Sequence, residues 1–377
     1  MKRVLSALVA VTAAAGIRAA SHVGFEADAF CQTVPGVSAG SQVFSPVSFE
    51  LDSVAFAEAV DTLTRAHVAE RLGVLSGFEP EYPPILAAVS ATTNGFSFVS
   101  ARGFCVPDVR EADPVFRRMI QRNYGVMSCP GFPVKGAESW FRAAMDGTME
   151  DFTVAFDAQR ADRYCYYDLV DLSVAWKEPF PRNNSRSLPF VCEDGAKLKL
   201  DFMADVRIAE TFETSKFTLL CLPLRGDARF YAMLPKPDVG LDDIREEISS
   251  SEIRNHLAAI RSTTNPGVVH GPTVVVIPRL EFDCRQDIGA TMRALRFPVQ
   301  GLLPVVGPGQ PLEIVQRVRF RLGECGADEK PLLEKPLDRQ VKATADARRV
   351  ILNRPFFFFV HHVETDTLLV MGQFVGK

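Results

Sequence analysis

The chain ends in the stretch NRPFFFFVHH, residues 353–362, followed by TDTLLVMGQFV, residues 365–375. Both segments are short, apolar and rich in aromatic and β-branched side chains, which are typical of strands. The polar residues 364–366, Glu-Thr-Asp, suit a tight turn between them. The stretch therefore predicts a β-hairpin at the C-terminus.

A long charged segment precedes this hairpin. It reads GECGADEKPLLEKPLDRQVKATADARR, residues 323–349, and lies between two apolar, strand-like segments, 314–322 and 350–360. An irregular segment of this length inside a compact domain either serves a function or hides a secondary-structure element. We expect residues 323–349 to form an exposed functional loop.

Helical and strand-like patterns divide the chain unevenly. Residues 48–75 carry the apolar periodicity of a helix, whereas 206–224 and 273–277 read as strands. Phenylalanine is frequent, with 28 residues, and much of it alternates with polar side chains, which favours sheets over a helix bundle. Because no internal repeat or linker is visible, the sequence predicts one α+β domain built on antiparallel sheets.

Composition excludes some classes of partner. A chain of 377 residues with 47% hydrophobic content can bury a large core. Its formal net charge is −4 with both signs mixed along the chain, so nothing indicates binding to nucleic acid. No internal segment approaches the roughly 20 consecutive apolar residues of a membrane helix, so we expect no membrane span.

The first residues have the pattern of a secretory signal peptide. Lys2 and Arg3 precede the apolar run 4–15, and small residues follow it. The run is too short to span a bilayer. We therefore predict a signal peptide at 1–21 and a single mature domain at 22–377; cleavage after Ala15 and cleavage near residue 21 both remain open, and a frayed amphipathic N-terminus is the alternative. A signal peptide implies a secreted, extracellular protein.

Motifs for catalysis and metal binding are missing. The sequence contains no G-x-S-x-G, H-E-x-x-H or phosphate-binding loop, which argues against an enzyme. There is no C-x-x-C, and no histidine has a second ligand at a recognised helical spacing. His361 and His362 are adjacent, but neighbours on a strand face opposite sides. We therefore expect no metal ion and no cofactor.

Secretion would permit two covalent modifications. The sequence has eight cysteines, an even number, but their wide spacing specifies no disulfide pairing, and isolated buried thiols are the favoured interpretation. Asn183-Asn184-Ser185 is an acceptor sequon in a polar turn, which makes Asn183 a glycosylation candidate.

The C-terminal stretch closely resembles the signature of the serpins, N-x-P-F-x-F followed after a few residues by T-x-x-x-L-F-M-G-x-V. Further serpin-like motifs occur in the same order as in that family, and an opening helix is expected at 25–30. These motifs are FSPVS (44–48), WFRAAMDGTMEDF (140–152), WKEPF (176–180) and PRLEF (278–282). The resemblance covers roughly residues 25–377.

This resemblance implies a fold and a mechanism. Serpins are single domains of three mainly antiparallel β-sheets and about nine helices, with an exposed reactive-centre loop after the fifth strand of the main sheet. A protease cleaves the loop as bait and is held as an acyl-enzyme while the loop inserts into the sheet as a new strand. We therefore expect a serine-type endopeptidase inhibitor that presents residues 324–349 as bait. It should be a monomer and no enzyme.

The hinge of this loop departs from the family pattern. Glu324 and Gly326 are retained, and Ala327 replaces the usual Thr. The next two positions that would face the core after insertion are Glu329 and Pro331. Burying a lone carboxylate costs several kcal/mol, and proline removes a ladder hydrogen bond. The hinge residues are Glu324, Cys325, Gly326, Ala327, Asp328, Glu329, Lys330 and Pro331.

These departures leave a second hypothesis open. Insertion past Asp328 should be much weaker than in trapping serpins, because Glu329 and Pro331 oppose it. The chain could therefore be a non-inhibitory serpin with a carrier, chaperone or other binding role.

A polar cluster that controls sheet opening in serpins also differs here. Asp168 stands where the family has Asn, and Gln316 where it usually has His. An amide such as Gln316 can still donate a hydrogen bond to the Asp168 carboxylate. The residues assigned to sheet opening are Ser45, Ser48, Asp168, Gln316 and Trp176.

Two counts place the scissile bond differently. Counting forward from Glu324 puts it near Gln340-Val341, beside Arg339-Gln340, whereas counting back from Asn353 gives Thr344-Ala345. Arg339 would suit a trypsin-like serine protease, whose specificity pocket is acidic. The alternative is that the basic side chains of this segment are only solvated loop charges. The reactive-site candidates are Arg339, Gln340, Val341, Thr344 and Ala345.

Overall fold

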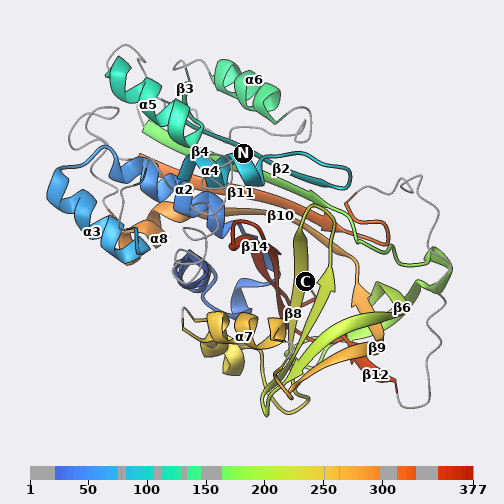
Figure 1. Ribbon diagram of the computed structural model, residues 1–377. Coiled ribbons are helices and arrows are strands. Elements are labelled where there is room, and N and C mark those ends of the chain that lie inside the picture. The colour runs from blue at the N-terminus through green and yellow to red at the C-terminus, as the bar shows by residue number, and fades with distance from the viewer. Residues whose placement is uncertain are drawn as a thin grey trace, which may run out of the picture.

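The computed structural model describes most of the chain, and Figure 1 shows its course. The described residues are 22–74, 78, 82–105, 113–129, 134–145, 164–249, 251–262, 264–297, 312–327 and 347–376. The predicted signal peptide, 1–21, and the loop residues 328–346 lie outside them.

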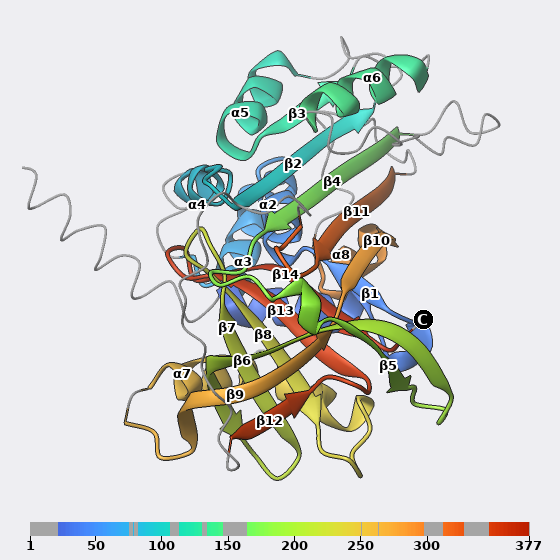
Figure 2. The same cartoon turned by 90° about the vertical axis from the view of Figure 1, so that its right-hand side faces the viewer.

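The described strands form two sheets. The first has five strands, and two neighbouring strands near its centre are parallel. Strands β4 and β11 are direct neighbours, and β2 joins the other edge of β4 in antiparallel fashion. Figure 2 shows β2, β4, β11 and β10 side by side. In spatial order the strands are β10 (Leu280–Asp287), β11 (Leu312–Leu322), β4 (Tyr164–Val174), β2 (Phe96–Cys105) and β3 (Val126–Cys129).

The second sheet has nine strands and contains the C-terminal hairpin. Strands β13 and β14 pair in antiparallel fashion, as the terminal stretch predicted. Along the main path the strands are β1 (Gln42–Phe44), β14 (Thr367–Phe374), β13 (Phe356–His362), β8 (Ala228–Pro235), β7 (Phe217–Pro223), β6 (Lys197–Glu213), β9 (Val268–Pro278) and β12 (Arg348–Ile351), with β5 (Arg186–Val191) paired to β6.

The long strand β6 explains why the expected three sheets connect as two. Its 17 residues pair with β5 at one end and with β9 over Phe202–Phe212, which gives a layer of β5, β6, β9 and β12. The last residues of β6, Glu210–Glu213, also pair with β7. The expected third sheet is therefore present, but β6 makes it continuous with the second. The pairing is mainly antiparallel, as expected.

Helices cover the sheets and are concentrated in the first third of the chain. The segment 22–33 is helical, which agrees with the expected opening helix. The remaining α-helices are α2 (Pro46–Ala57), α3 (Thr62–Leu72), α4 (Tyr82–Val89), α5 (Pro114–Tyr124), α6 (Val134–Ala144), α7 (Glu252–Arg261) and α8 (Ile288–Ala294). Short 3-10 helices are η1 (Val37–Ala39), η4 (Arg182–Asn184) and η5 (Asp242–Ile248).

The single helix predicted at 48–75 is wrong, because the structure has two helices there. The chain leaves the helical path after α2, and Asp61 begins α3 as its N-cap. The Asp61 carboxylate accepts hydrogen bonds from the backbone N–H groups of Leu63 and Thr64, both at 3.0 Å. This capping satisfies donors that a helix start leaves unpaired. The apolar periodicity continued across the break and concealed it.

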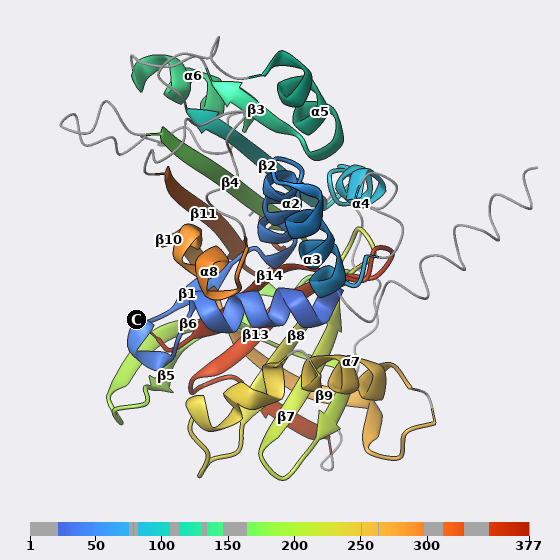
Figure 3. The same cartoon turned by 90° about the vertical axis from the view of Figure 1, so that its left-hand side faces the viewer.

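Helix α2 and aromatic side chains join the two sheets. Every residue of α2 is buried, and the helix contacts both β4 and β14 (Figure 3). Phe358 of β13 lies 5.2 Å from Phe282 of β10 and 5.7 Å from Phe320 of β11, between ring centroids. The C-terminal hairpin is therefore packed directly against the strand that leads into the charged loop.

Candidate functional site

The hinge begins with a tight turn at the end of β11. The N–H of Gly323 donates to the carbonyl of Gly326 at 2.9 Å, and the N–H of Gly326 donates back at 3.1 Å. Gly326 has φ +113°, and a Cβ at this position would lie 2.3 Å from the carbonyl oxygen of Val174 and 2.4 Å from Cα of Ala175. Both the left-handed backbone and the close approach require glycine here.

The turn is hydrogen-bonded to the end of β4. The indole Nε1 of Trp176 donates to the carbonyl of Gly323 at 2.8 Å, and the N–H of Phe180 donates to the carbonyl of Glu324 at 2.8 Å. The N–H of Ala327 donates to the carbonyl of Val174 at 2.8 Å. Ala327, just after the hinge turn, is thus already hydrogen-bonded to the last residue of β4.

A buried carboxylate in the hinge, that of Glu324, makes a further set of contacts. Glu324 is only 6% exposed and accepts hydrogen bonds from Arg279, with Nη2 to Oε1 at 2.6 Å and Nε to Oε2 at 3.1 Å. The hydroxyl of Ser185 donates to the same carboxylate at 2.5 Å. Burial raises the pKa of Glu324, but the bonds from Arg279 and Ser185 outweigh it, so the net pKa lies below its usual value. Glu324 is therefore ionised at neutral pH.

The five-stranded sheet is closed beside this hinge. Strands β4 and β11 pair directly, from Tyr164 opposite Leu312 to Ser173 opposite Arg321. The backbone groups of β4 and β11 that face each other are already hydrogen-bonded across the pair. A further strand can enter between β4 and β11 only if the ladder opens.

Four of the five residues assigned to sheet opening meet beneath this ladder. The hydroxyl of Ser48 donates to Oδ1 of Asp168 at 2.8 Å, and Nε2 of Gln316 donates to Oδ2 at 2.8 Å. The bond expected between Gln316 and Asp168 is therefore present. Oε1 of Gln316 also accepts from the N–H of Ser45 at 2.9 Å, and the hydroxyl of Ser45 donates to the carbonyl of Leu369 in β14 at 2.7 Å. These contacts link both central strands to α2 and to the second sheet.

Trp176 lies apart from this cluster. It is two residues beyond the end of β4, whereas Asp168 is in the middle of that strand. Its ring packs edge-on against Phe180 and Phe230, with centroids 5.2 and 5.4 Å away. Trp176 thus supports the hinge turn through Gly323, and the role of all five residues in sheet opening stays a prediction.

Sequence reasoning missed Arg102, a buried cation in the cluster. It is 2% exposed, and its Nη2 donates to the hydroxyl of Ser48 at 2.7 Å. Its Nε lies 3.6 Å from Oδ1 of Asp52 and 3.9 Å from Oδ1 of Asp168. The signal was available, because alternation along β2 places Arg102 in line with the buried Phe98 and Phe104.

Two carboxyl groups share this one guanidinium. Burial raises the pKa of Asp52 well above its usual value, the nearby Asp168 raises it further, and Arg102 lowers it only in part. The hydroxyl of Tyr166 donates to Asp52 from β4. Burial and the neighbouring carboxyl group thus favour the neutral form of Asp52, and Arg102 is the cation within 4 Å of both carboxyl groups.

Several predicted residues fall elsewhere. The hinge residues Asp328, Glu329, Lys330 and Pro331 and all reactive-site candidates lie outside the described residues. Asn183 is exposed on η4, and its glycosylation stays a prediction. Cysteine side chains described as free thiols are Cys31, Cys165, Cys192, Cys221, Cys284 and Cys325. In the part of the chain that the structure describes, none of the helices is long and apolar enough to cross a membrane.

Comparison with known proteins gives a consistent result. The family model described as "Serpin (serine protease inhibitor)" matches residues 24–376. Plasminogen activator inhibitor 1 of Bos taurus is 22% identical over 255 residues, a match that covers 62% of this chain and spans 59% of that protein. The native thermophilic serpin tengpin has a TM-score of 0.80 at 13% identity and covers 95% of this chain and 94% of its own. Thyroxine-binding globulin in complex with thyroxine has a TM-score of 0.76 at 14% identity and covers 94% and 98%. At these identities the two structures show the fold alone.

Proposed function

Because the chain belongs to the serpin family, we propose that it is a secreted inhibitor of a serine protease and presents residues 324–349 as the bait loop. The observation that carries this proposal is the position of the hinge. Ala327, the fourth residue of this loop, donates its backbone N–H to the carbonyl of Val174 at the end of β4. A loop that continued this pairing would enter the sheet between β4 and β11.

The chemistry of such an inhibitor requires no catalytic residue of its own. The protease serine attacks a loop carbonyl, the bond to the leaving amine breaks, and an acyl-enzyme forms. The serpin must then insert its loop before water hydrolyses that ester. Loop insertion and hydrolysis of the acyl-enzyme therefore compete. A residue that slows insertion favours hydrolysis, and the chain is then cleaved as an ordinary substrate.

The preferred target is a trypsin-like protease. Arg339 lies in the bait segment beside the candidate scissile bond Gln340-Val341, and cleavage at the adjacent Arg339-Gln340 bond would place its guanidinium in an acidic specificity pocket. When the chain is incubated with trypsin, it should abolish the hydrolysis of a chromogenic substrate by trypsin. The Arg339→Ala variant should inhibit trypsin at least tenfold more weakly. Lys342→Ala is the matched control. Undiminished trypsin activity at a large excess of the chain would refute the assignment.

A second function is supported by the hinge sequence, namely a non-inhibitory binding protein. Glu329 and Pro331 occupy positions that would face the core after insertion, and the hinge is held closed by Glu324, Arg279 and Trp176. Thyroxine-binding globulin, a protein with the same fold, has a solved structure in complex with the small ligand thyroxine. If the loop never inserts, its cleavage should leave the melting temperature almost unchanged. A large rise after cleavage would exclude this second function.

A further inference from the structure

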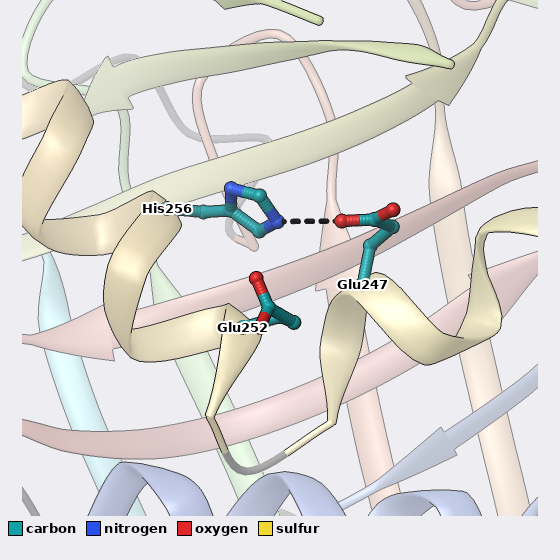
Figure 4. A group of neighbouring side chains, drawn as sticks. All are labelled: Glu247, Glu252 and His256. Carbon is teal, nitrogen blue, oxygen red and sulfur yellow. Dashed lines mark hydrogen bonds and ion pairs between the residues drawn. The ribbon is translucent and has the colours of Figure 1, made fainter.

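A histidine and two glutamates converge on the far side of the second sheet from the hinge ladder. The possible ligand atoms of Glu247, Glu252 and His256 all lie within 4.8 Å of one another. Figure 4 shows the three side chains. Glu247 belongs to η5, while Glu252 is the first residue of α7. His256 follows Glu252 by four residues and therefore shares its helix face. The sequence prediction that no histidine has a second ligand at helical spacing overlooked this pair.

The imidazole is held in place by aromatic packing. His256 is 8% exposed, and its ring lies edge-on against Phe217 of β7 with centroids 4.9 Å apart. Phe212 of β6 lies on another side at 6.2 Å. This packing directs Nε2 of His256 toward Oε2 of Glu247, 3.1 Å away. A fixed ring orientation is what a histidine ligand requires.

The spacing of the donors suits a small divalent ion. Four ligands at about 2.0–2.1 Å from Zn²⁺ in a tetrahedron are roughly 3.3 Å apart. The His256–Glu247 separation is already close to that value. Glu252 is partly exposed, and among the described residues its carboxylate has no recorded hydrogen bond or ion pair. Rotation of this one side chain would complete a set of three ligands without loss of an existing contact.

Glu247 is paired with an exposed lysine that a bound cation would displace. Its Oε1 lies 2.9 Å from Nζ of Lys216, whose side chain is 49% exposed. Lys216 and a metal ion would therefore compete for the same carboxylate.

We propose that Glu247, Glu252 and His256 form a binding site for a divalent transition-metal ion of the Zn²⁺ type. One imidazole nitrogen and two carboxylate oxygens match Zn²⁺ preferences, whereas Ca²⁺ and Mg²⁺ take oxygen ligands almost exclusively. A fourth position stays open for water. The ion would tie η5 to α7 across the first turn of the helix, and it does not depend on the bait loop.

Titration calorimetry of the full-length mature chain with ZnCl₂ tests the site. The wild type should bind one ion, and Glu252→Gln should weaken binding tenfold or more because a ligand carboxylate is lost. Zn²⁺ should also raise the melting temperature of the wild type, through preferential binding to the folded state, and not that of the variant. His270→Ala, which removes an exposed histidine of β9, is the matched control and should bind as the wild type does.

Two further variants separate a metal site from an ordinary ion-pair network. His256→Phe keeps the aromatic packing on Phe217 but removes the nitrogen donor, so it should also weaken binding tenfold or more. Lys216→Met removes the competing cation and should tighten binding. The proposal is overturned if the wild type takes up no Zn²⁺ at 1:1, or if Glu252→Gln and His256→Phe bind it as tightly as the wild type.

Discussion

Among the described residues of the loop, Glu324 is the carboxylate that bonds the hinge to Arg279 and Ser185. Its folded-state pKa is lowered, so its stabilising effect is fully present above the usual value of 4.5 and is lost as pH falls through the lower folded value. Hydrogen bonds to a charged group contribute about 1.5–3 kcal/mol each. The structure therefore predicts a hinge that loosens only under acidic conditions.

Glu324→Gln should reveal this effect in urea unfolding. The variant should be less stable than the wild type by about 1.5–3 kcal/mol at pH 7, and the difference should shrink as pH falls below about 4.5. Glu313→Gln is the control, because its carboxylate lies in an exposed ion pair with Arg285 and should matter little at any pH. A pH-independent difference for Glu324→Gln would contradict the interpretation.

Gly326 has two separate reasons to be glycine, and a pair of variants separates them. Gly195→Ala introduces a side chain at φ +79° with nothing within 4 Å, so it should cost only the backbone strain of about 1–2 kcal/mol. Gly326→Ala, at φ +113°, has backbone strain at least as large and also a clash with Val174 and Ala175, so it should cost clearly more. The free energies of unfolding from urea titrations measure both. Equal losses would show that the turn can move away from β4.

Arg102 should be essential because it neutralises a buried charge. Arg102→Met leaves Asp168 without its counter-ion and should destabilise the protein by about 3–5 kcal/mol. Asp168→Asn in the same chain removes that charge and restores the amide that serpins usually have there, so the double variant should recover much of the loss. A double-mutant cycle measured by urea unfolding gives the coupling. Additive losses would show that Arg102 does not stabilise Asp168.

At the level of elements, the β4–β11 ladder and the loop sequence both resist insertion of the loop. Insertion must open the ladder and then bury Glu329 and Pro331, at several kcal/mol for the carboxylate alone. Glu329→Ala with Pro331→Ala removes both obstacles. We expect this double variant to raise the share of covalent trypsin complex over cleaved chain, and to raise the melting temperature after cleavage. Lys330→Ala, at an outward position, is the control, and an equal rise there would refute the alternation argument.

Local sequence patterns predicted individual helices and strands better than the places where these elements break or join. The terminal hairpin was predictable because its apolar residues and polar turn are consecutive in the sequence. The break at 58–61 was not, because the apolar periodicity continues through it and only the Asp61 cap marks the new start. The joining of the sheets also escaped prediction, since it depends on the length of β6 and on two pairings that lie far apart in the chain.

The candidate site was predicted unevenly for the same reason. Family motifs located Ser45, Ser48, Asp168 and Gln316, but their hydrogen bonds span up to 324 residues and become visible only in the fold. Arg102 matches no motif and was evident only as a charge in an otherwise apolar line of β2. Contacts of this kind depend on register between distant strands, which sequence periodicity alone does not fix.

At the scale of the molecule, the charged segment links the two sheets. It leaves β11 in the five-stranded sheet and returns as β12 at the edge of the nine-stranded sheet. Cleavage would release this covalent link, while Phe282, Phe320 and Phe358 would keep the sheets packed. The cut loop would then be free to move independently of β12, which is the condition for insertion.

The most direct test of the bait-loop function is a denaturing gel after incubation of the mature chain with trypsin at increasing ratios. We predict an SDS-resistant band at the summed mass of chain and protease less the C-terminal peptide released at the scissile bond, accompanied by a large amount of cleaved chain because Glu329 and Pro331 slow insertion. Catalytically inactive trypsin should give neither band. Cleaved chain alone, at every ratio and time, would contradict the account.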